Sequence, residues 1–347
     1  MNRAPSEIQV SSQPKTAIAL NGGSSSLRAS PLRMNKVSLP LFFVMGKPGQ
    51  LGNRLFFFSY VISLAIKLGG RVANPGFAEF ALAFAATQAD AFCRWPPRHS
   101  VLRARWLADA LFEIVEFGFR AARKLRLPIP GVKLIGIHQA LTAEHGIQNE
   151  PFLESLRGAR IVFICGWIDL EKIQFEHPER IRAFFVPAES HRAAVGRLVD
   201  GARRECEVLV GIHIRQGDYA DFEGGRFYFS TAAYVKKMRH MSALFPEKKV
   251  GFIVCSNSPQ SIADPLLPTV FSGPGHPVED LYALAACDYI IGPPSTFSRW
   301  ASFYGKIPLW DMCDEDSLPK IEEFEIRLQT SPVPAALVPA ATGAYSP

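Results

Sequence analysis

The sequence predicts an α/β fold with two Rossmann-like, doubly wound domains that face a central cleft. Short apolar runs of strand length alternate with amphipathic stretches of helical length, the pattern of parallel sheets covered by helices. With 347 residues, 48% of them hydrophobic and 20% charged, the chain is long enough for two domains with separate cores. In such folds ligands bind at the carboxyl ends of the strands.

The expected domain boundaries follow from composition. Residues 1–36 are polar and rich in Ser, Gly and Pro, and residues 329–347 are a similar low-complexity stretch, so we expect two disordered tails. Between them we expect an N-terminal domain over residues 37–200 and a C-terminal domain over residues 201–328. Met34 stands just before the first predicted strand and is a candidate for the biological start.

Periodicity and turn residues predict the order of the elements. In chain order we expect a strand at 39–45, a helix at 51–68, a helical stretch at 81–126, a strand at 160–165, a helix at 190–204 and strands at 206–214, 248–257, 268–273, 288–294 and 306–310. Between the later strands, helices should begin near Pro259, Val278 and Ser295.

Net charge indicates the class of ligand, and cysteine spacing indicates the redox compartment. The chain has 38 Lys and Arg against 32 Asp and Glu, a net charge of +6, and its pI is near 9.0. This balance suits an anionic ligand or an acidic membrane surface and is too mild to indicate nucleic acid. The six cysteines form no C-x-x-C pair, so we expect free thiols in a reducing cytosol.

No segment has the roughly 18 uninterrupted apolar residues that indicate a membrane-spanning helix. The nearest candidate, Leu55 to Ile66, ends at Lys67. The segment 94–126 is basic, and we expect its arginines on a solvated face; peripheral contact with the inner face of an anionic membrane is the alternative. We therefore expect a cytoplasmic protein.

The segment VGIHIRQGDY, residues 210–219, places cations where a buried strand becomes a loop. Residues two apart on a strand share a face, so His213 and Arg215 should point the same way at its carboxyl end. Arginine binds phosphate with two hydrogen bonds and keeps its charge. Gly217 allows a turn, and Asp218 can orient Arg215 or cap that turn. The alternatives are a purely structural Arg215–Asp218 pair and a hydrogen-bonded core role for His213.

The segment DYIIGPPSTFSRW, residues 288–300, predicts a strand followed by a helix N-terminus. Ser295 or Thr296 stands at the N-cap position, and a free helix N-terminus with hydroxyl groups can bind an anion. Capping alone would also explain both residues. Upstream, Glu279 and Asp280 open another helix, where a carboxylate either complements the helix dipole or accepts hydrogen bonds from a sugar or ribose.

The segment GKPGQLGNR, residues 46–54, joins the first strand to the first helix. Its glycines do not have the G-x-G-x-x-G spacing of dinucleotide-binding loops, and no acidic residue follows about 20 positions on. It is better explained as a tight turn that brings Asn53 and the helix start into the cleft.

The residue patterns of several other enzyme classes are absent from the sequence. The sequence has no H-E-x-x-H, G-x-S-x-G or Walker motif, and its eight histidines are scattered. The segment Asp314–Asp316 matches a D-x-D metal motif, but it lies late in the chain, where we expect a solvated acidic turn. We therefore expect no metal and no other cofactor.

Taken together, these motifs resemble the α-1,2-fucosyltransferases of glycosyltransferase family 11 and, more distantly, the protein O-fucosyltransferases. The family's G-x-L-G-N turn is matched at residues 49–53, its H-x-R-R-G-D-Y at 213–219, and its E-D-L-Y and I-I-x-x-S-S/T-F-S-W-W segments at 279–282 and 290–300. CGWIDLEKI and FIVCSNS resemble two further family segments. The order of the matches holds from about residue 40 to residue 310.

The resemblance implies a GT-B fold and the inverting, metal-independent transfer of fucose from GDP-fucose to a glycan hydroxyl. It assigns the acceptor to the N-terminal domain, with a loop at Gly49, Gly52 and Asn53, and the donor to the C-terminal domain. Arg215 would neutralise the diphosphate, Asn53 would lie near the reacting centre, and Asp218 is a candidate general base. The implied donor-binding residues are His213, Arg215, Gly217, Asn257, Asp280, Ser295, Thr296, Phe297 and Ser298.

Three residues depart from the family pattern. Gln216 replaces a second arginine, Arg299 replaces a tryptophan and Arg54 replaces a glutamine. Arg299 would restore the charge lost at Gln216 if both face the diphosphate. Two alternatives stay open: a GT-B transferase with another nucleotide-sugar donor, and a non-catalytic nucleotide- or glycan-binding relative.

Overall fold

The computed structural model describes residues 39–99, 105–125, 129–137, 147, 149–168, 175–267 and 269–327. Both expected tails, 1–36 and 329–347, lie outside the described residues. The division at residue 200 stays a prediction, because the described residues cluster as one unit.

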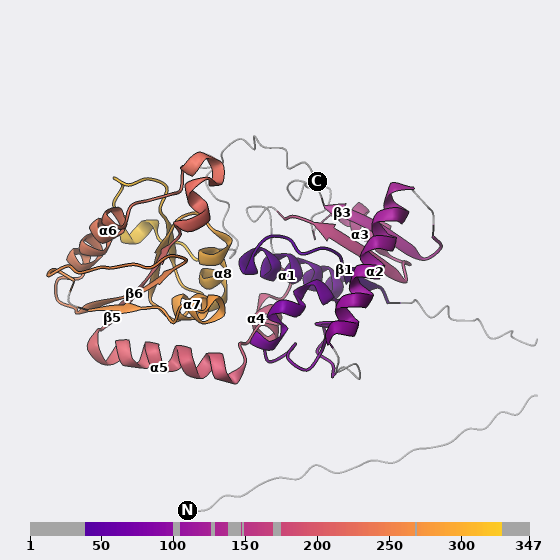
Figure 1. The fold of residues 1–347 in the computed structure, drawn as a ribbon, viewed down its shortest axis with the longest axis horizontal. Coiled ribbons are helices and arrows are strands. Elements are labelled where there is room, and N and C mark those ends of the chain that lie inside the picture. Colours follow the sequence, from indigo (N-terminus) through magenta and orange to yellow (C-terminus); the bar gives the residue numbers. More distant parts are fainter. Residues whose placement is uncertain are drawn as a thin grey trace, which may run out of the picture. The chain divides into compact units, whose positions relative to one another are not determined.

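The first sheet contains β1 (Leu41–Val44), β2 (Arg71–Ala73), β3 (Val132–Ile137) and β4 (Ile161–Gly166) (Figure 1). Its strand order is β2-β1-β4-β3, and every neighbouring pair is parallel. The helices of this half are α1 (Leu51–Leu68), α2 (Arg105–Lys124), α3 (Glu150–Leu156), α4 (Pro178–Phe184) and a 3-10 helix at Pro75–Ala83.

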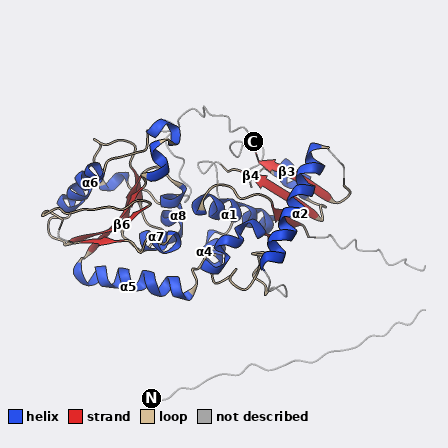
Figure 2. Ribbon diagram, in the orientation of Figure 1, coloured by secondary structure: helices blue, strands red, loops and turns tan. Residues whose placement is uncertain are grey.

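The second sheet contains β5 (Val208–Ile214), β6 (Val250–Ser256), β7 (Val270–Ser272), β8 (Tyr289–Gly292) and β9 (Leu309–Asp311). Its order is β7-β6-β5-β8-β9, again with parallel neighbours. The helices of this half are α5 (Glu189–Glu205), α6 (Thr231–Leu244), α7 (Pro277–Leu284) and α8 (Thr296–Gly305), drawn around the strands in Figure 2. The two parallel sheets confirm the predicted α/β, doubly wound fold.

Strand β5 shows why the second sheet is covered on both faces. All seven of its residues are buried, as expected for a central parallel strand. Because side chains alternate between faces, Val208, Val210 and Ile212 pack in one cluster with α6, while Leu209 packs in another with α7. The strand therefore ends between two helical layers, which fixes where the residues after Ile214 emerge.

Helix α1 has the predicted bounds and ends at Gly69, which takes a left-handed conformation with a φ of 67°. In the part of the chain that the structure describes, α1 is the helix that is long and apolar enough to span a membrane, and 72% of it is buried inside the protein. Its burial is that of a core helix.

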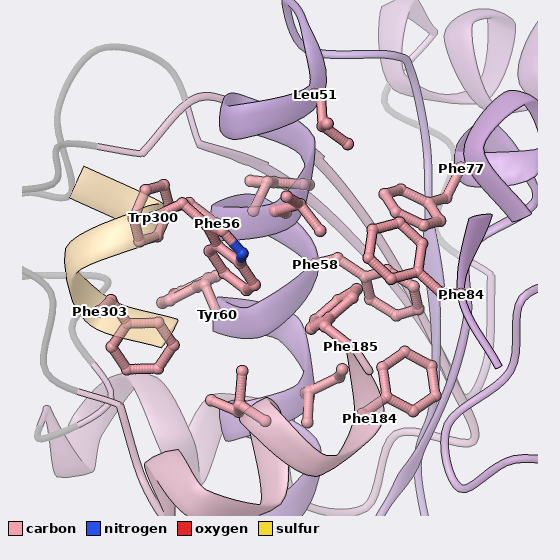
Figure 3. Close-up of a cluster of buried hydrophobic side chains, with 14 of the residues drawn as sticks. Leu51, Phe56, Phe58, Tyr60, Phe77, Phe84, Phe184, Phe185, Trp300 and Phe303 are labelled. Atoms are coloured by element: carbon pink, nitrogen blue, oxygen red, sulfur yellow. The ribbon is translucent and has the colours of Figure 1, made fainter. Parts of the chain in front are cut away.

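An aromatic core joins α1 to α8 (Figure 3). Phe56 of α1 meets Trp300 of α8 edge to face, with ring centroids 5.2 Å apart. Phe185, which follows α4, contacts both Trp300 at 5.2 Å and Phe58 at 5.5 Å. Such contacts contribute about 0.5–1.5 kcal/mol each beyond burial. They hold the start of α8 against the turn that precedes α1.

Two of the expected helices are wrong, one in its extent and one in its existence. Residues 84–99, inside the expected helical stretch 81–126, are not helical, because the carboxylate of Asp90 accepts the N–H groups of Phe92 and Arg94 and prolines follow at 96 and 97. Residues 259–264 form no helix. Strands β2 and β3 and helix α6 have no counterpart among the expected elements.

The cysteines agree with the sequence-based expectation. None of the six forms a disulfide bond, and Cys93, Cys206, Cys255 and Cys287 are buried.

Candidate functional site

The carboxyl edge of the second sheet brings the predicted donor-binding residues into one row. In the strand order β7-β6-β5-β8, Asp280 lies beside the turn after β7, Asn257 follows β6, Arg215 follows β5, and the start of α8 follows β8. Parallel strands place all of these loops on the same edge. Residues from Arg215 to Thr296, which lie far apart in the sequence, thus form one candidate site.

Arg215 is held in place by two acceptors from different parts of the chain. Its Nε and Nη2 donate to Oδ1 and Oδ2 of Asp218 at 2.9 and 2.6 Å. Nη2 also donates to Oε1 of Gln50 at 2.9 Å, and the guanidinium carbon lies 5.1 Å from the ring centroid of Tyr219. The contact with Gln50 links this site to the turn before α1, and sequence reasoning did not predict it.

Asp218 is placed to orient Arg215. Its hydrogen bonds from the Arg215 guanidinium hold the pKa of its carboxyl below the usual value. A carboxylate with a lowered pKa is a weak proton acceptor. Between the two predicted roles of Asp218, the geometry favours orientation of Arg215 over general-base catalysis.

Asn257 forms hydrogen bonds with the loop that follows Arg215. Its Oδ1 accepts the backbone N–H of Gln216 at 2.9 Å, and its Nδ2 donates to Oδ1 of Asp218 at 3.2 Å. A Cβ at Gly217 would lie 2.7 Å from Asn257 Nδ2, so glycine leaves room for the Asn257 amide in its present position. Asn257 therefore fixes the backbone that carries Arg215.

Gln216 and Arg299 take separate partners, and the expected compensation between them stays a prediction. Gln216 donates to the carbonyl oxygen of Phe229 at 3.0 Å and accepts from Gln260 at 2.9 Å. Arg299 pairs with Asp311 at 3.4 Å. Both departures from the family pattern have local structural partners.

His213 is a core residue rather than a direct ligand contact. It is 4% exposed, its Nδ1 lies 2.7 Å from Ser298 Oγ, and its ring packs 4.9 Å from that of Phe297. Burial, together with the nearby charge of Arg215, lowers the pKa of His213 to about 3. The neutral imidazole thus ties β5 to the first turn of α8.

The N-terminus of α8 is capped and closely packed. Ser295 Oγ accepts the N–H of Phe297 at 3.2 Å, which confirms the predicted N-cap. A Cβ at Gly52 would lie 2.9 Å from the carbonyl carbon of Thr296. Gly52 therefore allows the acceptor-side turn to approach the start of α8.

Asp280 is buried in the first turn of α7. Its Oδ1 accepts the N–H of Gly275 at 2.9 Å, and burial raises the pKa of its carboxyl to about 6. A Cβ at Gly273 would lie 2.7 Å from the same oxygen, so the turn after β7 closes over Asp280.

Beside Asp280, three residues have the side-chain types of a transition-metal site. Ligand atoms of His191, His276 and Glu279 lie within 4.8 Å of one another. However, His191 Nδ1 is bonded to Glu279 Oε1 at 2.8 Å, and His276 Nδ1 accepts the N–H of Val278. The first contact links α5 to α7, and together the two contacts use one candidate ligand atom from each of the three residues.

The acceptor-side turn is shaped by Gly49, whose φ is +53°. A Cβ there would clash with the Asn53 side chain and lie 2.9 Å from the Trp167 ring. Arg54 donates to the Gly49 carbonyl at 3.1 Å and pairs with Glu79 at 2.9 Å, so it supports the turn. Trp167, directly after β4, is 47% exposed. Its position after a strand end could have identified it as a candidate site residue from the sequence.

A cavity of about 540 Å³ lies elsewhere, between α6 and residues 261–264. The predicted central cleft stays a prediction.

The sequence is similar to one family model and to several curated proteins. Residues 165–306 match the model described as Glycosyl transferase family 11. Galactoside alpha-(1,2)-fucosyltransferase 1 of Rattus norvegicus is 28% identical over 184 residues, 48% of this chain and 46% of that protein. The Bos taurus protein of the same name is 27% identical over 184 residues, with 48% of each chain covered. The chain spans about half the length of these curated relatives.

Among solved structures, a mutant of Arabidopsis thaliana FUT1 in complex with GDP has a TM-score of 0.52 at 13% identity, and the match covers 86% of this chain and 76% of that one. Fucosyltransferase NodZ from Bradyrhizobium has a TM-score of 0.48 at 18% identity, with 78% and 94% covered. The first of these shows the GT-B fold. The family model, the curated relatives and the fold together confirm the resemblance of this chain to glycosyltransferase family 11.

Proposed function

We propose that this chain transfers fucose from GDP-fucose to a hydroxyl group of a glycan, with inversion and without a metal ion. The observation that carries the proposal is Arg215, which is fixed at the carboxyl end of β5 inside the segment that matches family 11. A held guanidinium beside a helix N-terminus suits the two phosphates of a nucleoside diphosphate.

In the proposed reaction, the acceptor oxygen forms a bond to C1 of fucose. The bond between C1 and the β-phosphate oxygen breaks, GDP leaves with the bonding electrons, and the acceptor proton passes to a base. Arg215 stabilises the negative charge that develops on the leaving diphosphate. Asp218 and Gln50 keep the guanidinium in position for this role.

The remaining residues divide between donor and acceptor. Asn257 shapes the loop that carries Arg215, and we assign the Asp280 carboxyl to the nucleoside end of the donor. Asn53 and the exposed indole of Trp167 lie at the acceptor-side turn, and an aromatic face is a suitable platform for a sugar ring. We further propose a cytoplasmic location, which the absence of disulfide bonds among the six cysteines supports.

The test is nucleotide release from a panel of donors. The full chain is incubated with EDTA and GDP-fucose, GDP-mannose, UDP-galactose or UDP-glucose, each with and without galactose-terminated glycans. We expect acceptor-dependent release of GDP from GDP-fucose alone. Release from another donor would contradict the proposed donor, and GDP binding without turnover of any donor would contradict the enzymatic function.

Arg215→Ala should abolish release from GDP-fucose. Arg226→Ala is the matched control, because Arg226 lies on the same connection to α6 and pairs only with a neighbour, Glu223, among its ion-pair partners in the described residues. Equal activity of the two variants would argue against the role of Arg215.

A further inference from the structure

The outward face of α2 is apolar. Trp106, Ile114, Phe117 and Leu125 are exposed at 69%, 68%, 77% and 66%. With Ala110 and Ala121 between them, successive members are three or four residues apart, which places the set on one side of the helix, with Leu125 directly after its last residue. Together they form a continuous stripe, which we call the α2 stripe.

The α2 stripe is not what attaches the helix to the protein. Phe112 and Phe119 are buried, and they pack with Met45 and Phe163 at the first sheet, beside which Figure 1 shows α2. Phe112 and Phe119 lie on the side of the helix opposite Phe117, given 3.6 residues per turn. The helix thus has two apolar faces, and within the described residues the face with Phe112 and Phe119 is buried while the α2 stripe is exposed.

Exposed apolar patches of this kind mark interaction surfaces, since leaving several large side chains in water forgoes their burial. The small residues Ala110, Gly118 and Ala121 alternate with the large ones, and a Cβ at Gly118 would meet nothing within 4 Å. Such alternation leaves space into which the large side chains of a second helix fit. The shape therefore suits a helix as the occupant.

The charges beside the stripe distinguish between possible occupants. Asp109 and Glu113 are exposed along its edge in the first half of α2, and Arg120 and Lys124 are exposed along the same edge in the second half. An anionic membrane would attract the second half and repel the first. An antiparallel copy of the same helix would match acid to base at both ends.

We propose that α2 is the interface of a homodimer in which the α2 stripes of two copies pack antiparallel about a two-fold axis. A single register satisfies both charge pairs. Asp109 and Lys124 are equally distant from the point between Glu116 and Phe117, and so are Glu113 and Arg120. Asp109 therefore faces Lys124 of the partner subunit while Glu113 faces Arg120 of the partner subunit, and Phe117 lies next to the axis.

The contact is isologous, as two-fold interfaces require, so each charge pair occurs twice. The interface involves none of the candidate-site residues, and it can be tested without any assay of fucosyl transfer. A result that contradicts the dimer would not contradict the proposed function, and a result that contradicts the proposed function would not contradict the dimer.

The first test measures molar mass by light scattering across a concentration series of the full chain. We expect a dimer for the wild type and for Leu266→Glu, which replaces an equally exposed leucine in the second half. We expect a monomer for Phe117→Glu, with unchanged circular dichroism and thermal unfolding, because the Phe117 side chain is 77% exposed in the monomer. A wild type that stays monomeric, or a Phe117→Glu variant that stays dimeric, overturns the proposal.

The second test is a charge swap. Asp109→Lys and Lys124→Asp should each weaken dimerisation about tenfold, and the double variant should recover the wild-type dissociation constant. Two weakened single variants without recovery contradict the antiparallel register. Co-flotation of a monomeric wild type with vesicles of anionic phospholipid, lost in Phe117→Glu, would instead identify α2 as a membrane contact and overturn the dimer.

Discussion

Arg215 donates two hydrogen bonds to Asp218, at 2.9 and 2.6 Å, and this pair sets the direction in which the guanidinium can meet an anion. The pKa of Asp218 is lowered by the same bonds, so the carboxylate stays ionised at neutral pH. Asp218 has two possible roles, orientation of Arg215 and general-base catalysis. They can be distinguished by replacing its carboxylate with a neutral amide.

For Asp218→Asn we expect a loss of about tenfold in kcat/KM, since the amide can still accept one bond from Arg215. A general base would cost about 10²–10⁴-fold and would remove the acidic limb of the pH profile. Steady-state kinetics from pH 5 to 9 distinguish the two cases. Asp221→Asn, at an exposed position nearby, is the control. A loss beyond a hundredfold together with a flattened acidic limb would restore the general-base role.

Asp280→Asn should raise the stability of the folded protein at neutral pH and weaken donor binding. Burial raises the pKa of Asp280 from 3.8 to about 6, so the folded protein loses stability as the pH rises from about 4 through 6. Asparagine keeps the acceptor for Gly275 without this loss and should raise the free energy of unfolding at pH 7.5 by up to about 3 kcal/mol. Urea titrations at pH 4 and pH 7.5 measure the difference.

The gain should vanish at pH 4, and GDP affinity should fall because a buried carboxylate is lost. Asp316→Asn, at a fully exposed position, should show no such dependence on pH. A constant gain at both pH values would mean that the Asp280 carboxyl is not the titrating group.

His213→Asn should flatten the loss of stability in mild acid. The pKa of His213 falls to about 3 in the folded protein, whereas it is 6.5 unfolded, so stability is complete above 6.5 and is lost as the pH falls towards 3. Asparagine can keep a hydrogen bond to Ser298 without taking up a proton. Unfolding free energies at pH 4.5 and 7 should converge for this variant but not for His177→Asn, whose side chain is exposed.

Trp167→Ala should raise the KM for the glycan acceptor about tenfold and leave the KM for GDP-fucose unchanged. The indole is exposed beside Gly49, where it can stack on a sugar ring without touching the donor edge. Tyr228→Ala, an exposed aromatic residue in the loop before α6, is the control. An equal rise in both KM values would show that Trp167 supports the turn instead.

Gly52→Ala should weaken GDP binding at least tenfold. The added methyl group would lie 2.9 Å from the carbonyl carbon of Thr296 and 3.0 Å from the nitrogen of Phe297, and backbone atoms cannot move aside as a flexible side chain can. The first turn of α8 must therefore shift. Gly196→Ala meets nothing within 4 Å and should leave binding unchanged in the same calorimetric titration.

The sequence by itself determined the elements whose pattern is local. Helix α1 has the predicted bounds because an unbroken apolar run ends at Gly69, which can adopt the left-handed conformation. Strand β5 and the N-cap at Ser295 follow from equally short patterns. The edge strand β3 was missed because Lys133 and Gly136 interrupt its apolar run.

Only the tertiary structure decided which residues meet. Gln50 and Arg215 lie 165 positions apart, and their contact depends on how the aromatic core around Phe56 and Trp300 sets α1 against α8. The separate partners of Gln216 and Arg299, and the outward apolar face of α2, were equally hidden in the sequence. Local patterns specify backbone conformation because neighbouring residues determine it, whereas side-chain partners depend on packing between distant segments.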